Sequence, residues 1–134
     1  MTMASIFSKI ISGEIPSYKV AESEAFYAFL DINPMAKGHT LVVPKEEVDY
    51  YFDLSNDTLS KMSVFCKDVA KAIEKVVECE RVGVAVLGLE VPHAHVHLIP
   101  ITTLEDLNFS RPKLKLSKSE FETIAENIQK ELLK

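Results

Sequence analysis

The residues best suited to chemistry are four histidines, three of which fall within five positions. His93, His95 and His97 alternate with apolar residues, and His39 begins a separate β-type run. Because side chains alternate faces along a strand, the three close rings are expected to share one face. Neighbouring imidazoles repel one another when charged and lose their charge when buried, so such a row calls for an anion or a metal ion. We therefore expect a functional site here.

A zinc site is one explanation for this row of rings. Zinc bonds imidazole nitrogen at about 2.0–2.1 Å, whereas His93 and His97 would lie about 13 Å apart along a flat strand. These two rings do not converge on one ion, although two neighbouring rings with His39 would. A strand-borne zinc site is therefore kept as the minor alternative, and we expect no metal and no other cofactor.

An anionic group such as a phosphate fits the pattern better. Imidazoles offer N–H donors to phosphate oxygens, and a neutral imidazole attacks electrophiles near pH 7. The central ring, His95, would attack phosphorus if a backbone carbonyl held its other nitrogen. The flanking imidazoles would supply the charge that stabilises a five-coordinate phosphorus. Gly88 and nearby backbone N–H groups would complete the oxyanion site.

The elements around these residues predict an α+β protein with a mostly antiparallel sheet. Apolar residues at spacings of three, four and seven predict a long helix over 57–78, capped by Asn56 or Asp57. A short helix begins at Ser5, and a capping box at 117–120 opens a last helix. Strands are predicted at 18–22, 25–31, 39–43, 82–87 and 91–101, the first two as a hairpin.

Length and composition exclude several classes of protein. The 134 residues suffice for one domain, which we expect over 1–134, with 102–134 as an extended tail and a C-terminal helix. A net charge of −5 argues against a nucleic-acid partner. No run suits a membrane span, and the first residues do not read as a signal peptide. The two cysteines form no C-x-x-C pair, which favours a cytoplasmic setting.

The stretch His93-Ala-His-Val-His-Leu-Ile resembles the signature of the histidine triad (HIT) family, His-φ-His-φ-His-φ-φ, in which φ is apolar. Three further stretches resemble other landmarks of that family: Ile6-Phe-Ser-Lys-Ile-Ile-Ser-Gly-Glu-Ile-Pro16, Phe29-Leu-Asp-Ile-Asn-Pro34 and Gly38-His-Thr-Leu-Val-Val-Pro-Lys45. All four follow in the family's order. The chain is similar to the bacterial HIT-like branch of nucleotide hydrolases and transferases.

This resemblance implies both a fold and an activity. The HIT-like fold is a five-stranded, mostly antiparallel sheet with one long helix and short terminal helices, usually paired as a homodimer. The activity is hydrolysis or transfer that cleaves nucleoside 5′-phosphoramidates or related nucleotidyl compounds. In the family, the histidine at the position of His95 attacks the α-phosphorus and forms a nucleotidyl-histidine intermediate. His93 and His97 would orient it and contact phosphate, and His39 matches an additional histidine near the site.

Six residues match positions that hold the nucleotide in the family. Asp31 matches the acidic residue that binds the ribose hydroxyls. Glu90 lies where a side chain near the phosphate is expected, although its carboxylate would repel that group. The apolar positions among these six on the first helix could equally be core residues, because an apolar stripe on a helix commonly packs against the core. The walls around the base are matched by Ile6, Phe7, Ile10 and Ile32.

The polar residues that support the triad differ from those of the phosphoramidase type. Val82 and Leu89 stand where those relatives carry Asn and Gln, and Glu47 stands where a histidine is usual. Ile101 occupies a position that is Arg in many bacterial members. Loss of one transition-state donor costs about 10²–10³ in rate, so we expect slow turnover of standard substrates. The alternative is a nucleotide-binding or sensing protein with weak or no turnover.

Overall fold

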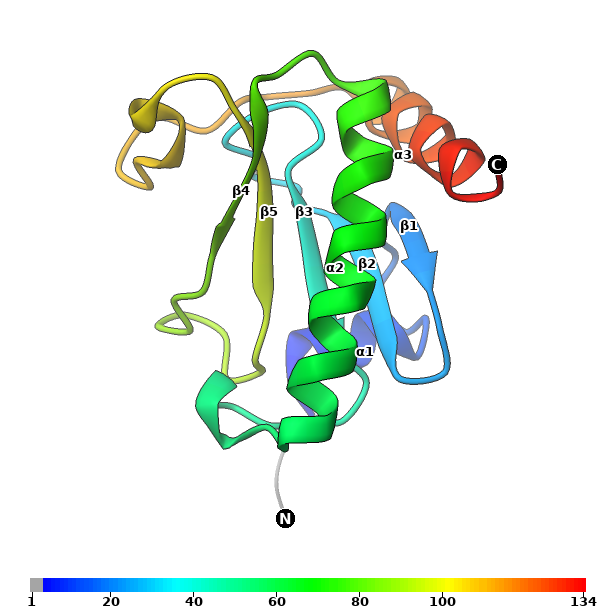
Figure 1. The fold of residues 1–134 in the computed structure, drawn as a ribbon, viewed down its shortest axis with the longest axis vertical. Coiled ribbons are helices and arrows are strands. Elements are labelled where there is room, and N and C mark those ends of the chain that lie inside the picture. Colours follow the sequence, from blue (N-terminus) through cyan, green and yellow to red (C-terminus); the bar gives the residue numbers. More distant parts are fainter. Residues whose placement is uncertain (1–3) are drawn as a thin grey trace.

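The computed structural model describes residues 4–134 as one sheet with helices on both of its faces (Figure 1). The strands are β1 (Lys19–Glu22), β2 (Phe26–Leu30), β3 (Thr40–Pro44), β4 (Arg81–Ala85) and β5 (Val96–Ile101). Their spatial order is β1-β2-β3-β5-β4, and each pair of neighbours is antiparallel. The expected α+β class with a five-stranded antiparallel sheet is confirmed, and β1 and β2 form the predicted hairpin.

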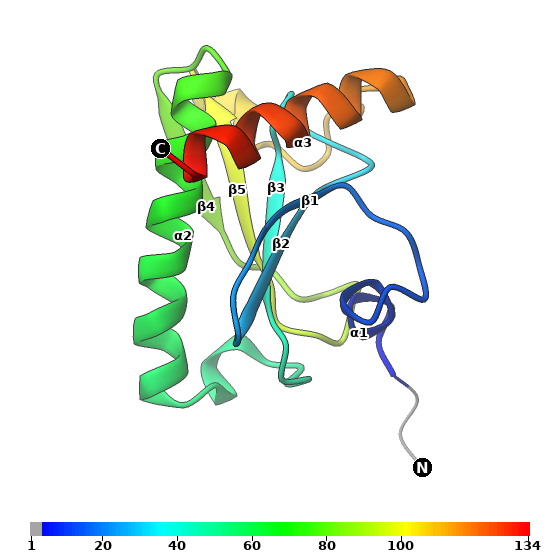
Figure 2. The same cartoon turned by 90° about the vertical axis from the view of Figure 1, so that its right-hand side faces the viewer.

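Three α-helices cover the sheet unequally (Figure 2). The long α2 (Asn56–Val76) and α3 (Lys118–Leu132) pack on one face, whereas the short α1 (Ile6–Ile11) packs on the other. Two 3-10 turns, η1 (Tyr51–Asp53) and η2 (Leu104–Leu107), lie before α2 and after β5. None of the helices within residues 4–134 is long and apolar enough to cross a membrane.

The helix starts follow their capping residues, with one correction. Ser117 and Glu120 form the predicted capping box of α3, each side chain bonding to the other's backbone N–H. The predicted caps of α2, Asn56 and Asp57, lie inside the helix, because Ser55 is the extended residue whose hydroxyl accepts the N–H of Thr58. Any of the three side chains suits a cap, so local sequence alone did not decide between them.

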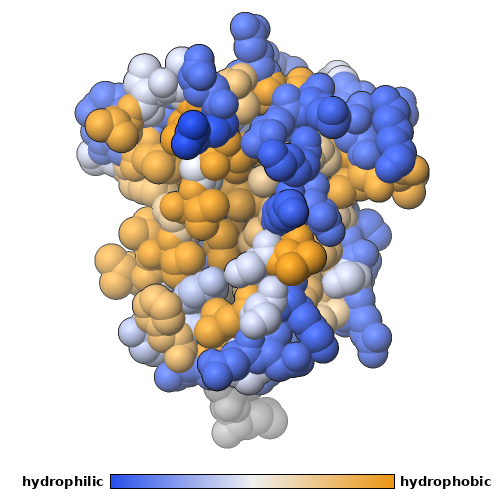
Figure 3. Space-filling view, viewed as in Figure 1, coloured by the Kyte–Doolittle hydropathy of each residue, from blue (hydrophilic) through white to orange (hydrophobic). Residues whose placement is uncertain are grey.

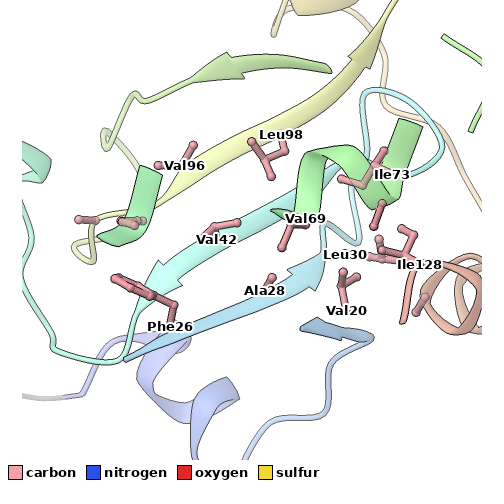
Figure 4. Packing of buried hydrophobic residues seen from close by; sticks show 14 of the residues in the cluster. Val20, Phe26, Ala28, Leu30, Val42, Val69, Ile73, Val96, Leu98 and Ile128 are labelled. Atoms are coloured by element: carbon pink, nitrogen blue, oxygen red, sulfur yellow. The ribbon is translucent and has the colours of Figure 1, made fainter. Parts of the chain in front are cut away.

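The main hydrophobic core lies between the sheet and the pair α2 and α3 (Figure 4). Ala94, Val96 and Leu98 are buried in this core, as their alternation with the histidines predicts. The opposite face of the sheet packs against Phe7 and Ile10 of α1. The helices fill the main core with apolar side chains that include Val69, Ile73 and Ile128.

Two strands are shorter than the sequence predicts. The run 91–101 is strand only from Val96, because Pro92 has no N–H for a central ladder and the N–H of Ala94 donates instead to the carbonyl of Val48 at 2.7 Å. The run 82–87 is strand only to Ala85, which lies opposite His97. Beyond that pair β5 continues for only one more residue, Val96, so little strand remains for residues 86 and 87 to pair with.

The turn before β3 depends on a glycine. Gly38 has a φ of +90°, in the left-handed region where a side chain is disfavoured. A Cβ atom there would lie 2.8 Å from Cγ2 of Val77, at the end of α2. Gly38 therefore lets the chain pass close under the helix and delivers His39 to the start of β3. By contrast, Gly13 has a φ of +85° but open space around it.

Candidate functional site

A cavity of about 550 Å³ lies beside α1, between the ends of β2, β3 and β5. This volume is typical of a site for a small organic ligand. His93 does not line the cavity and is fully buried. The other sequence-predicted site residues all line it: Ile6, Phe7, Ile10, Asp31, Ile32, His39, Glu90, His95 and His97.

The hydrogen bond of His95 fixes its tautomer. Nδ1 of His95 lies 2.8 Å from the carbonyl oxygen of His93, and a carbonyl only accepts, so Nδ1 carries the proton and donates it. Burial is the main reason that the pKa of His95 is lowered, which keeps the ring neutral. Nε2 of a neutral ring protonated at Nδ1 holds a lone pair. His95 therefore presents an unprotonated nitrogen on a ring that lines the cavity.

His93 supports this arrangement from behind the cavity. Its Nε2 lies 2.8 Å from the carbonyl oxygen of Pro44 and donates to it, so Nδ1 accepts a hydrogen bond from the hydroxyl of Ser5 at 2.7 Å. Both ring nitrogens are thus used within the protein. This placement suits the orienting part of the role predicted for His93 and leaves neither nitrogen for a phosphate oxygen.

Ser5 joins the triad to helix α1. Its hydroxyl caps α1 by accepting the N–H of Ser8 at 3.0 Å while it donates to His93. Glu47 holds the same turn from outside, since Oε1 accepts the N–H of Ser5 at 2.6 Å and the hydroxyl of Ser8 at 2.7 Å. These hydrogen bonds are the main reason that the pKa of Glu47 is lowered. α1 also carries Phe7, whose ring centroid lies 4.9 Å from that of His95.

His39 and His97 form a second hydrogen-bonded pair. Nδ1 of His39 accepts the N–H of Met35 at 3.0 Å, so Nε2 of His39 carries the proton. That Nε2 lies 2.9 Å from Nδ1 of His97 and donates to it. The remaining nitrogen of His97, Nε2, is therefore the protonated one and offers an N–H. The two triad rings that line the cavity thus differ: His95 offers a lone pair and His97 offers a donor.

The histidine pair is neutral in the folded protein. Burial lowers the pKa of His39 to about 3, with a smaller contribution from His97, and it lowers the pKa of His97 to about 4, with a smaller contribution from His95. The expectation that flanking imidazoles supply positive charge is therefore wrong for His97 at neutral pH. The ring of His39 stays neutral although Oδ2 of Asp31 lies 3.5 Å from its Nε2, because burial dominates its pKa.

Two carboxylates also line the cavity. Oδ1 of Asp31 accepts the N–H of Asn33 at 2.8 Å, and burial is the main reason that its pKa is raised. Its other oxygen, Oδ2, remains near His39 at the cavity wall. Glu90 is exposed at the rim. The carboxylate of Asp31 is thus oriented by the turn that follows β2, as a receptor for hydroxyl groups would be.

The apolar walls come from α1 and the turn after β2. Phe7 and Ile10 are buried against the sheet and also line the cavity, so they act as core and as wall. Ile6 and Ile32 are 49% and 65% exposed and line the cavity without belonging to the core. An apolar slot between polar groups suits a flat, partly hydrophobic ligand.

The only compact group of metal-binding side chains among residues 4–134 is Asp31, His39 and His97, whose ligand atoms lie within 4.8 Å of one another. The proton between the two rings already accounts for their separation of 2.9 Å. A cation bound there would have to displace this proton.

The model of the HIT domain matches residues 12–104. The chain belongs to the HIT family. It is 35% identical over 131 residues to an uncharacterized HIT-like protein of Borreliella burgdorferi, covering 92% of this chain and 94% of that protein. It is also 35% identical over 133 residues to the adenosine 5′-monophosphoramidase of Schizosaccharomyces pombe, covering 97% and 99%.

The fold of this HIT protein matches solved structures of the family. A HIT-like protein of Bartonella henselae, described as involved in cell-cycle regulation, superposes with a TM-score of 0.82 at 29% identity, over 98% of each chain. The family and the fold inferred from the four sequence landmarks are thus both confirmed.

The departures noted in the sequence occupy different places in this HIT protein. Leu89 lines the rim of the cavity and is 91% exposed, so an apolar side chain stands where an amide was expected. Val82 lies in β4 opposite Pro100, packs against the main core and does not line the cavity. The carboxylate of Glu47 is hydrogen-bonded to Ser5 and Ser8 at the start of α1. Only Leu89 of these three positions therefore changes the polarity of the cavity directly.

Sequence reasoning missed one wall of the cavity. Phe109 and Lys113 line it, although the sequence predicts only an extended or irregular segment over 102–116. The ring centroid of Phe109 lies 5.1 Å from that of His97. No periodicity marks these two residues, because the contact depends on how the segment folds back after β5.

Proposed function

We propose that this HIT protein cleaves nucleoside 5′-phosphoramidates or related nucleotidyl compounds through a covalent nucleotidyl-His95 intermediate. The observation that carries the proposal is the tautomer of His95, whose Nδ1 is held by the carbonyl of His93 at 2.8 Å while Nε2 is free. A neutral imidazole with a free nitrogen is a nucleophile at physiological pH. The similarity to a yeast protein named adenosine 5′-monophosphoramidase supports the substrate class.

The reaction proceeds in two displacements. Nε2 of His95 attacks the α-phosphorus, a P–Nε2 bond forms and the bond to the leaving amine breaks, with a proton from solvent taken up by the amine nitrogen. Water then attacks the same phosphorus and gives up a proton to solvent, which breaks the P–Nε2 bond, releases the nucleoside monophosphate and returns His95 to its starting state. The N–H of His97 Nε2 is the donor for a phosphate oxygen in both steps. His39 is a positioning residue, because it fixes the tautomer of His97.

The nucleoside occupies the rest of the cavity. Ile6, Phe7, Ile10 and Ile32 form the apolar slot for the base, and Asp31 accepts hydrogen bonds from the ribose hydroxyls. Glu90 at the rim disfavours additional negative charge on that side.

The decisive experiment follows adenosine 5′-phosphoramidate hydrolysis by the wild type and by His95→Ala. The wild type is expected to release AMP and to show a nucleotidyl adduct by intact mass after brief mixing, and His95→Ala is expected to do neither. Binding of AMP by the variant serves as the control for an intact cavity. Equal turnover by the two proteins would refute the role of His95.

A nucleotide-binding or sensing function without efficient turnover is the second candidate. It is favoured by Leu89, an exposed apolar side chain at the cavity rim where phosphoramidases carry an amide. Micromolar affinity for AMP together with no release of product from any nucleotidyl compound tried would support this function. Metal analysis of protein prepared without chelators addresses the remaining zinc alternative.

We also infer that the protein pairs as a homodimer through β4 and α2. β4 is an edge strand of the sheet, with one side unpaired in the single chain. Apolar side chains gather on the face formed by β4 and α2 (Figure 3), where Val64 and Val84 are each 61% exposed. A shallow groove of about 310 Å³ runs there beside Tyr51 and Cys66. A monomer in sedimentation at micromolar concentration would refute this pairing.

A further inference from the structure

The segment that follows β5 folds back over the cavity and is tied down at several points. The N–H of Leu114 donates to the carbonyl of Pro34 at 2.9 Å, which attaches the segment to the turn after β2. Arg111 Nη1 donates to the carbonyl of Glu105 at 2.8 Å and lies 3.2 Å from Oδ1 of Asp106. Since the HIT model ends at residue 104, this wall is a feature of the chain outside the matched domain.

The cavity wall carries more carboxylates than cationic side chains. Asp31 and Glu90 contribute carboxylates, and the rings of His39 and His97 are neutral at physiological pH. Lys113 is the only lysine or arginine among the residues of 4–134 that line the cavity. A bound phosphate group therefore meets one formal positive charge on the wall, and that charge belongs to the segment after β5.

Resting on the proposed function, we propose that Lys113 binds the anionic phosphate of the nucleotide and selects phosphorylated ligands over the neutral nucleoside. Nζ of Lys113 donates to the carbonyl oxygens of Phe109 and Arg111. An ammonium has three N–H donors, so one remains for a ligand. Nζ also lies 6.0 Å from the ring centroid of Phe109, which itself packs against His97. The cation is thus held one aromatic ring away from the triad.

Lys113 also compensates for what the triad lacks. Leu89 at the rim offers no hydrogen bond, and the neutral ring of His97 offers a donor without a formal charge. A lysine on a flexible stem is a common phosphate-binding group and acts as a point charge. The contrary explanation is that Lys113 only ties the segment together through the two carbonyls. That explanation predicts the same loss for every ligand of the cavity.

The test compares the affinities of AMP and adenosine, measured by calorimetry, in the wild type, Lys113→Met and Lys113→Arg. Lys113→Met is expected to bind AMP about tenfold more weakly, the loss of one charge-assisted hydrogen bond at a half-exposed position. Its affinity for adenosine is expected to be unchanged, and Lys113→Arg is expected to retain most of the preference for AMP. Lys115→Met is the matched control, because Lys115 is exposed and does not line the cavity.

Each other outcome overturns a defined part of the argument. Equal weakening of AMP and adenosine in Lys113→Met would mean that the lysine acts only on the shape of the segment. Unchanged affinity for both ligands would remove Lys113 from the site while the proposed function stands. A wild type that binds neither AMP nor adenosine would overturn the nucleotide site itself, and this proposal with it.

Discussion

Acidification from about pH 7 to about pH 5 is expected to destabilise the protein through His39 and His97. Their folded-state pKa values are about 3 and about 4, below the ordinary value of 6.5. A histidine with a depressed folded pKa binds its proton more readily in the unfolded chain, so the free energy of unfolding falls as pH falls. The stabilisation is fully present above pH 6.5 and is lost progressively as the pH falls toward the two folded values.

The magnitude follows from proton linkage. At about pH 5 each of these rings is mostly protonated in the unfolded chain and neutral in the folded protein, which costs about 2 kcal/mol per ring relative to pH 7. The two rings together account for about 4 kcal/mol, a large share of a typical stability of about 5–15 kcal/mol. His95 adds in the same direction because its pKa is also lowered. Asp31 acts in the opposite direction, since its folded pKa is raised.

The measurement is urea unfolding monitored by circular dichroism at about pH 7, 6 and 5, with linear extrapolation to water. His97→Asn removes one of the two rings, and its loss of stability over this range is expected to be smaller by about 2 kcal/mol. Carboxylates with lowered pKa values, such as Glu22 and Glu120, change the stability mainly below their ordinary pKa of 4.5, so they contribute little between about pH 7 and about pH 5. A wild-type stability that stays constant within about 1 kcal/mol would refute the buried neutral pair.

Two further predictions concern stability and use matched pairs of substitutions. Ser5→Ala removes a helix cap and the donor to the buried ring of His93, so urea unfolding should show a loss of about 2–3 kcal/mol in the free energy of unfolding. Ser55→Ala removes only an exposed cap and should lower that free energy by about 1 kcal/mol. Equal losses in the two variants would contradict the contact with His93. Gly38→Ala should lower the free energy of unfolding by at least about 2 kcal/mol and Gly13→Ala by about 1 kcal/mol, because only Gly38→Ala adds a steric clash to an unfavourable φ. Similar melting temperatures for the two variants would contradict the clash at Gly38.

Local patterns predicted the elements well wherever one physical signal dominated. The long helix was clear from its apolar spacing, and Ser117 with Glu120 fixed the start of the last helix within a few residues. The predicted ends of strands were wrong where hydrogen bonds to another segment of the backbone decided them. The strand expected from residue 91 begins at Val96, because Ala94 bonds to the carbonyl of Val48, far away in the sequence.

The candidate site divides in the same way. The types and spacing of the histidines predicted a row of rings facing one cavity, and the family landmarks added Asp31 and the apolar wall. Neither source showed that His93 is enclosed and serves Ser5, nor that Lys113 faces the cavity. The contact of His93 with Ser5 joins segments 88 residues apart, and the position of Lys113 depends on an irregular loop, so no local period marks either of them.

The sequence by itself determined the chemistry that is available: imidazoles at alternate positions of a run that leads into a β-strand, an apolar helix beside them and an acidic residue after the second strand. Only the tertiary structure decided which nitrogen of each ring holds a proton. The partners of His93 and His97 are Pro44 and His39, which are far away in the sequence. Those of His95 and His39 are nearby backbone groups that the folded chain aligns with the rings. Tertiary burial also decided that His39 and His97 are neutral, since the pKa of a histidine depends on its removal from water as much as on its neighbours.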